Sequence, residues 1–278
     1  MRIAVNHLTR YRFDEPQDRI VQALRMRPCD TDHQTVIAWR IDVDRDARLK
    51  KQEDGFGNEV TMVYVPGPLD SLDLLVTGEV LTDDNADGIV RGAAEPLPPE
   101  LFLRGSPRTV PGEGIAGFAS DFLGKGASIE TLHALNCALG ERMELRAARP
   151  EDRRTAAEAF AAGAASAREL ANILVAAARS ADLPARFVSG YRAQSDEHPR
   201  AMLHAWAEIY VPGAGWIGLD ATSGLFAGEG HIPLAATPAP QSAAPISGSL
   251  SGNAKVAFDF DMQVTRLKET PRITRPYS

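Results

Sequence analysis

The sequence predicts an α+β fold, in which a β-rich N-terminal domain precedes a core of helices packed on an antiparallel sheet. Two observations support this prediction. Apolar and polar residues alternate through much of the first third of the chain, as they do in half-buried strands, whereas helical spacing begins only near residue 128. We therefore expect a β-rich domain at 1–92, a linker at 93–114, a core with a C-terminal strand at 115–267 and a loose tail at 268–278.

Three alternating runs predict the strands of the N-terminal domain. Asp54-Gly55 and Gly57-Asn58 favour turns between strands, and we expect this antiparallel domain to end near Asp87. Residues 93–114 then hold five prolines and three glycines, which is typical of a linker or an extended crossing segment. The alternating residues are Ile3, Val5, His7, Thr9, Tyr11 and Phe13, then Ile37, Trp39, Ile41 and Val43, then Val60, Met62 and Tyr64.

Three helices are predicted in the core from their caps and their apolar spacing. Ser128 can cap the first helix, Thr155-x-x-Glu158 is a capping box for the second, and Gly163 ends that second helix. Ser166-x-x-Glu169 is a further capping box, and it makes the alanine at position 167 the first residue of the third helix. The apolar positions are Ile129, Leu132, Leu135, Leu139 and Met143 in the first helix, and Leu170, Ile173, Leu174 and Ala177 in the third.

After these helices the pattern returns to β structure. Residues 186–191, 205–211 and 216–219 are predicted strands, and the residues Pro-Gly-Ala-Gly join the last two. Residues 235–253 are rich in Ala, Pro, Ser and Gly, which predicts a long loop. A final strand is predicted through Val256, Phe258, Phe260, Met262 and Val264.

Composition argues against several classes of function. The 278 residues are 44% hydrophobic, which is enough for a real core, and the net charge of −7 argues against a nucleic-acid or anionic-membrane partner. The two cysteines, Cys29 and Cys137, form neither a disulfide framework nor a zinc pattern, and the histidines lack metal-ligand spacing. The first residues lack the apolar region of a signal peptide and no apolar run reaches the length of a membrane span, so we expect a cytoplasmic protein.

One helix start and two strand residues suggest thiol chemistry. Ala167 occupies the position where free N–H groups and the helix dipole would stabilise a thiolate. His204 opens the strand LHAWAEIYV and Asp220 ends the strand GWIGLD, so a His to deprotonate a thiol and a carboxylate to orient that His are both present. Their spacing of 16 residues is even. The two side chains therefore share a face of the sheet only if the loop between the strands has an odd number of residues or the hairpin has a bulge.

The segment SARELANILVAAARSADLPARFVSGYR, followed by LHAWAEIYVPGAGWIGLDATSG, resembles the core of the bacterial transglutaminase-like superfamily, whose members are often described as candidate cysteine proteases. The resemblance implies a papain/transglutaminase-like core. It places Ala167 at the nucleophilic Cys, His204 at the catalytic His and Asp220 at the catalytic Asp. Two departures stand out, because Ala221 replaces a usual Pro and the alanine at 167 removes the nucleophile.

The resemblance extends over nearly the whole chain. HLTRYRFDEP and DGFGN are similar to the β-rich N-terminal region that accompanies these cores, and GHIPLAATPAPQSAAPISGSLSG resembles the segment after the catalytic Asp. The several spaced motifs recur in order, which makes the resemblance specific. It suggests that His231 lies near the site.

Several other residues are weighed as parts of a cleft. The substrate-cleft candidates are Ser166, Trp206, Glu208, Tyr191 and His231. Ser166 is a poor substitute nucleophile because its hydroxyl caps the helix. Trp206 and Trp216 are better explained as core or pocket-wall aromatics, Arg186 as an ion-pair partner, and Glu208 as a structural residue. Cys137 is expected to be a buried, inert thiol, whereas Cys29 could be exposed and oxidisable.

These observations leave three functions open. The first is a cysteine peptidase or amidase with a Cys-His-Asp triad, inactive as written because residue 167 is Ala through an engineered change or a natural loss. The second is a natural pseudoenzyme that binds a peptide or protein, with the N-terminal sheet offering an edge for strand addition. The third is a cross-linking acyltransferase, in which an amine replaces water. No metal or organic cofactor is implied, the partner is a peptide or protein substrate, and the oligomeric state stays open.

Overall fold

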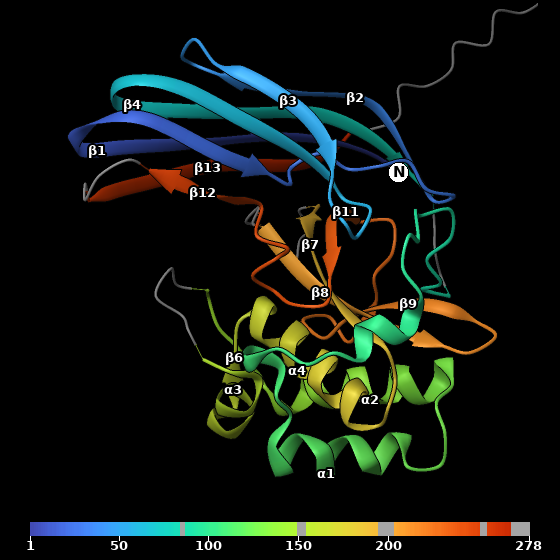
Figure 1. Cartoon of the computed structure of the whole chain (residues 1–278). Helices are drawn as coiled ribbons and strands as arrows, with labels where there is room; N and C mark the ends of the chain where they lie inside the picture. Colours follow the sequence, from blue (N-terminus) through green and yellow to red (C-terminus); the bar gives the residue numbers. More distant parts are fainter. Residues whose placement is uncertain (84–86, 149–153, 194–202, 251–254, 268–278) are drawn as a thin grey trace, which may run out of the picture.

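The computed structural model describes residues 1–83, 87–148, 154–193, 203–250 and 255–267. It confirms the α+β fold. A large antiparallel sheet lies at one end of the molecule, a second antiparallel sheet lies in the middle, and the helices cover the face of the second sheet that points away from the first (Figure 1). Among the described residues, no helix is long and apolar enough to cross a membrane.

The large sheet is built on two long strands from the N-terminal part of the chain. β1 and β4 pair along most of their length, with irregular register near Gln17. The strand order is β12-β1-β4-β2, with β13 also paired to β1 and β3 to β4. The strands are β1 (Arg2–Leu24), β2 (Gln34–Val43), β3 (Arg48–Glu53), β4 (Glu59–Thr82), β12 (Ile246–Leu250) and β13 (Val256–Leu267).

The final strand pairs in a place that the sequence pattern did not indicate. We grouped it with the core at 115–267, but β13 pairs antiparallel with β1 over twelve positions, from Arg2 opposite Leu267 to Phe13 opposite Val256. The physical reason is burial, because Met262 and Val264 join one apolar cluster with residues of β1. The strand therefore belongs to the N-terminal sheet, while the boundaries drawn at 92 and 114 stay predictions.

The second sheet carries the helices. Its strand order is β10-β9-β8-β7-β11, all antiparallel, and a short parallel pair, β5 with β6, lies beside it. The strands are β5 (Glu144–Leu145), β6 (Ala164–Ala165), β7 (Ala185–Arg192), β8 (Leu203–Val211), β9 (Gly215–Asp220), β10 (Leu225–Phe226) and β11 (His231–Thr237). The helices are α1 (Gly112–Leu123), α2 (Ile129–Arg142), α3 (Ala156–Ala162) and α4 (Ala167–Ser180).

The predicted helix caps are all present. Ser128, Thr155 and Ser166 accept hydrogen bonds from the backbone three residues later, and Gly163 ends α3 in the left-handed conformation at φ 68°. Helix α4 is buried along all the residues from Glu169 to Ala178 rather than on one face. Its many alanines allow this, because small side chains let α1, α3 and strands β7 and β8 approach the helix closely.

The predicted linker at 93–114 is an ordered strap across the core. It forms two short 3-10 helices, η1 (Pro99–Leu103) and η2 (Pro107–Thr109), and its last residues begin α1. Phe102 is buried edge-on against Trp216, and the guanidinium of Arg179 donates to the Phe102 carbonyl at 2.8 Å and to Thr109 Oγ1 at 3.0 Å. Glu95 pairs with the buried Arg186 at 2.9 Å. Prolines and glycines therefore shape this segment without making it loose.

A buried polar chain joins the two sheets. His7 Nδ1 of β1 lies 3.0 Å from the Tyr191 hydroxyl of β7, and Thr9 Oγ1 lies 3.2 Å from His7 Nε2. Apolar residues of both sheets surround this chain, since Ile3 and Val5 of the large sheet share a cluster with Tyr191 of the second sheet. Burial lowers the pKa of His7 to about 4, so the imidazole is neutral at pH 7.

We expect His7 to make the folded protein sensitive to mild acid. A folded-state pKa near 4, below the ordinary 6.5, means that the unfolded chain takes up the proton first. The free energy of unfolding should therefore fall between pH 6.5 and 4, by about 2 kcal/mol from pH 7 to 4.5. Urea unfolding of the unchanged chain and of His7→Gln at both pH values measures this loss. An equal pH dependence in the two chains would contradict the expectation.

Candidate functional site

The hairpin of β8 and β9 brings His204 and Asp220 together. Val211 pairs with Gly215, so the loop is the three residues 212–214, and the hairpin shows no register shift. The expectation of an odd loop is therefore confirmed. β8 ends at Val211 as predicted, and β9 begins at Gly215, one residue before the predicted start at 216. Both side chains lie on the same face of the sheet, and His204 Nε2 is 2.8 Å from Asp220 Oδ2.

Asp220 is fully buried, and each of its carboxylate oxygens has partners. Oδ2 also faces His231 Nε2 at 3.0 Å and the Arg192 guanidinium at 3.2 Å. Oδ1 accepts hydrogen bonds from the Thr222 backbone N–H at 3.0 Å and from its hydroxyl at 2.7 Å. Burial alone would raise the pKa of Asp220, but its contacts with His204 and His231 hold that pKa well below the usual range. The carboxylate is therefore ionised and fixed.

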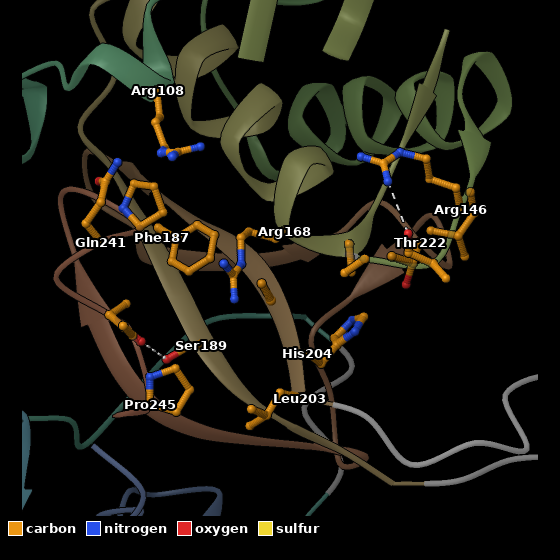
Figure 2. Close-up of a pocket in the computed structure, with 18 residues that line it drawn as sticks. Arg108, Arg146, Arg168, Phe187, Ser189, Leu203, His204, Thr222, Gln241 and Pro245 are labelled. Atoms are coloured by element: carbon orange, nitrogen blue, oxygen red, sulfur yellow. Dashed lines mark hydrogen bonds between the residues drawn. The ribbon is translucent and has the colours of Figure 1, made fainter. Parts of the chain in front are cut away.

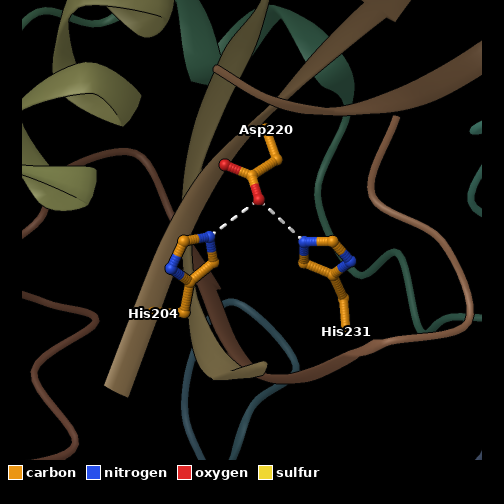
Figure 3. A group of neighbouring side chains, drawn as sticks. All are labelled: His204, Asp220 and His231. Atoms are coloured by element: carbon orange, nitrogen blue, oxygen red, sulfur yellow. Dashed lines mark hydrogen bonds and ion pairs between the residues drawn. The ribbon is translucent and has the colours of Figure 1, made fainter. Parts of the chain in front are cut away.

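The two imidazoles differ in their second nitrogen. His231 Nδ1 accepts a hydrogen bond from the Gly228 backbone N–H at 3.2 Å, so its Nε2 must carry the proton that is donated to Asp220. Burial lowers the pKa of His231, which keeps it neutral. Among the described residues, His204 Nδ1 has no hydrogen-bond partner, and Figure 3 shows it on the side of the ring away from Asp220. His204 is thus the member of the pair with a nitrogen left for other chemistry.

The start of α4 is held as firmly as Asp220. Glu169 Oε2 accepts hydrogen bonds from the Ser166 backbone N–H at 2.9 Å and from its hydroxyl at 3.0 Å. Two guanidinium groups also pair with the same carboxylate, Arg146 at 2.6 Å and Arg154 at 2.8 Å. Burial opposes ionisation of Glu169, but the hydrogen bonds from Arg154 and Ser166 leave its pKa lowered. Position 167 therefore sits on a rigid helix end.

A cavity of about 680 Å³ contains both Ala167 and His204 in its wall (Figure 2). Most of the wall is apolar, and it comes from the loop before α3, the start of α4, strands β7 and β8, and the loop at 240–245. Arg108 of η2, Arg146 and Arg168 add positive charge to it. A ligand in this cavity would lie against both the helix start and the histidine, which is the arrangement that acyl-transfer chemistry needs.

The other cleft candidates do not line this cavity. Ser166 is buried under the Glu169 carboxylate, and Tyr191 is buried with its hydroxyl against His7. The Trp206 ring packs against both His204 and His231, with its centre 6.3 and 5.1 Å from theirs. Glu208 pairs with the buried Arg186 at 2.6 Å, and that guanidinium stacks over Trp216 at 4.2 Å. His231 supports Asp220 from behind.

The two cysteines lie outside the cavity wall. Cys29 is exposed. Cys137 on α2 is half-buried, and its thiol donates to the Gly224 carbonyl at 3.2 Å.

Sequence reasoning missed several residues that support the site. Arg192 contacts both Asp220 and the Thr222 hydroxyl, the latter at 2.8 Å. The position of Thr222 two residues after an aspartate is the usual pattern of an Asx turn, so this partner could have been found from sequence. Arg192, Arg108 and Arg146 carry no such local signal, because only the packing of distant segments brings them to the site.

The cluster of His204, Asp220 and His231 also has the composition of a metal site, with ligand atoms within 4.8 Å of one another. Its hydrogen bonds fit that use poorly. Both imidazoles already face the same oxygen, Asp220 Oδ2, and a cation bound there would stand beside the Arg192 guanidinium, 3.2 Å from that oxygen. The donor set fits a hydrogen-bonded carboxylate better than a metal centre.

Two family models match this chain. Residues 3–81 match the bacterial transglutaminase-like N-terminal region, and residues 117–221 match the transglutaminase-like superfamily. The chain belongs to the transglutaminase-like superfamily. The matched core of this superfamily member runs from α1 through Asp220 and includes Ala167 and His204. The two matched regions together cover more than half of the chain.

Two solved structures align with this chain over most of its length. A protein from Cytophaga hutchinsonii described as a candidate cysteine protease is 18% identical, with a TM-score of 0.73 over 98% of this chain and 93% of that one. The periplasmic domain of TgpA from Pseudomonas aeruginosa is 14% identical, with a TM-score of 0.37 over 78% of this chain and 87% of that one. No match was found among curated proteins. The first likeness shows that both sheets and the helices form one shared fold.

We expect Asp220→Asn to destabilise the protein strongly. The change removes the charge that compensates the half-buried Arg192, and it places an amide N–H₂ group among groups that already donate. Urea unfolding should show a loss of about 3 kcal/mol or more. Asp259→Asn is the matched control, because Asp259 is exposed and pairs with Arg10 at the surface, so its loss should be below about 1 kcal/mol. Equal losses in the two variants would contradict the account of Asp220 given above.

Proposed function

We propose that this chain carries the amide-binding site of a transglutaminase-like cysteine peptidase or amidase without its nucleophile, and that it binds a peptide or protein without cleaving it. One observation carries the proposal. His204 is held by Asp220 through Nε2, its Nδ1 is left without a described partner, and it shares a cavity wall with Ala167 at the start of α4. The family membership supports the same proposal.

The chemistry of such a site explains what position 167 lacks. A thiol there would give its proton to His204 Nδ1, and the thiolate would attack the amide carbonyl carbon. The backbone N–H at residue 167 would stabilise the oxyanion, and the imidazolium would then protonate the departing amine. Water would release the acyl group from sulfur in the second step. With alanine at 167 no acyl bond forms, so the bound amide stays intact.

The groups around position 167 do not depend on the missing sulfur. Glu169 holds the helix start by accepting a hydrogen bond from the Ser166 backbone N–H and by pairing with two arginines. Asp220 holds His204 by a hydrogen bond to its Nε2. Alanine differs from cysteine by one sulfur atom, so it leaves this frame in place. The proposal therefore makes restoration of the thiol a direct test.

Ala167→Cys should give a reactive thiolate at neutral pH and below. The helix start and His204 both favour the charged form, so alkylation by iodoacetamide should follow an apparent pKa well below the free-cysteine value of about 8.5. The measurement is the rate of alkylation at residue 167 against pH, read by peptide mass spectrometry so that Cys29 and Cys137 are counted separately.

Two further variants complete this test. Ala147→Cys places a thiol in the wall of the same cavity but off the helix, and it should titrate like an ordinary cysteine. Adding His204→Ala to Ala167→Cys should move the apparent pKa back towards the ordinary value. If the Ala167→Cys thiol titrates like the Ala147→Cys thiol, the site is not a disabled acyl-transfer site.

A further inference from the structure

The charge of the cavity differs from the charge of the protein. The chain has a net charge of −7, yet the described residues of the cavity wall include three arginines and no aspartate or glutamate. The three come from separate segments, because Arg108 is in η2, Arg146 follows β5 and Arg168 is in α4. A concave site lined by one sign of charge attracts ligands of the other sign.

Arg146 and Arg108 differ in whether their charges are already paired within the protein. Arg146 is paired with the buried Glu169 at 2.6 Å, so its charge helps to hold the start of α4. Arg108 is different. Although it is half-buried, it makes no side-chain hydrogen bond or ion pair with any residue that the structure describes. By contrast, the buried Arg186 has two carboxylate partners, Glu95 and Glu208.

Arg108 and His204 lie at opposite sides of the cavity. In the view of Figure 2, Arg108 lies on one side beside Gln241, His204 lies on the other side, and the Arg168 side chain lies between them. His204 is nine-tenths buried, and its Nδ1 has no described hydrogen-bond partner. A ligand that contacts both His204 and Arg108 would therefore lie across the cavity along Arg168.

We propose that the cavity selects acidic peptides, an inference that rests on the proposed function. The Arg108 guanidinium binds a carboxylate of the ligand, while the amide that an active enzyme would cleave lies against His204 and position 167. A guanidinium binds a carboxylate through two parallel N–H···O bonds, which are stronger than neutral hydrogen bonds. The largely apolar wall lowers the local dielectric constant, which strengthens this pairing. The volume of about 680 Å³ suits a short peptide segment.

The test measures binding of peptide pools to the unchanged chain. The pools are dye-labelled heptapeptides with neutral randomised flanks, blocked by an amide at the C-terminus, and carrying either Glu or Gln at the central position. Fluorescence polarisation should give at least about tenfold tighter binding for the Glu pool at low salt, with the difference shrinking as salt rises. A third pool has Gln at the centre and a free C-terminal carboxylate. Comparing its binding with that of the Glu pool shows whether the cavity binds a side-chain carboxylate or a terminal one.

Arg108→Gln is the decisive variant, and Arg104→Gln is its matched control. Both remove one positive charge from the same strap, but Arg104 is exposed and outside the cavity wall. Arg108→Gln should bring the Glu and Gln pools to within about twofold of each other, whereas Arg104→Gln should keep the roughly tenfold preference. Thermal unfolding confirms that each variant is folded.

Three outcomes would overturn the proposal. Equal binding of the acidic and neutral pools by the unchanged chain would show a cavity without charge preference and would leave the proposed function standing. A Glu preference that survives Arg108→Gln would remove Arg108 from the assignment. If no pool binds, the acidic-peptide proposal fails, and alkylation of the Ala167→Cys thiol decides separately on the proposed function.

Discussion

The site depends on one buried carboxylate. Asp220 ends β9, and its oxygens contact His204 of β8, His231 at the start of β11, Arg192 at the end of β7 and Thr222 in the following turn. Four segments of the second sheet are thereby joined at one point. A buried charge with this many partners tolerates little movement, because each displaced donor would leave a polar group unsatisfied. The orientation of His204 is a consequence of this constraint.

The start of α4, in the opposite wall of the cavity, is also held by a buried carboxylate with several partners. Glu169 compensates Arg146 and Arg154 while it accepts hydrogen bonds from Ser166. Helix α4 is buried along most of its length, so its first turn is fixed both by packing and by charge. The cavity therefore lies between two carboxylate-centred networks, one in the sheet and one at the helix start. Neither network uses the side chain at position 167.

Local patterns allowed much of this arrangement to be predicted. The capping boxes at Thr155 and Ser166 determine where helices begin, and the even spacing of His204 and Asp220 requires the odd hairpin loop that β8 and β9 form. These features depend on residues close in sequence. The resemblance to the family added expected roles for position 167 and for the two paired residues, and these roles stay predictions.

Features that depend on distant packing could not be predicted in the same way. Alternation showed that residues 256–264 form a strand, but alternation does not name a partner, and the strand pairs with β1. The prolines and glycines at 93–114 suggested a linker, whereas Phe102 and Glu95 anchor that segment to the core. The presence of Arg108 in the cavity wall follows from that anchoring, so no local signal could reveal it.

The pairing of β13 with β1 has a consequence for how the protein is made. During synthesis β1 emerges first, and β4 can pair with one of its edges soon afterwards, but the strands for its other edge, β12 and β13, leave the ribosome only after the whole core. Until then β1 presents an open edge, which is a template for pairing with another chain. The large sheet is thus completed last although it begins first, and a fragment that ends before β12 leaves that edge uncovered.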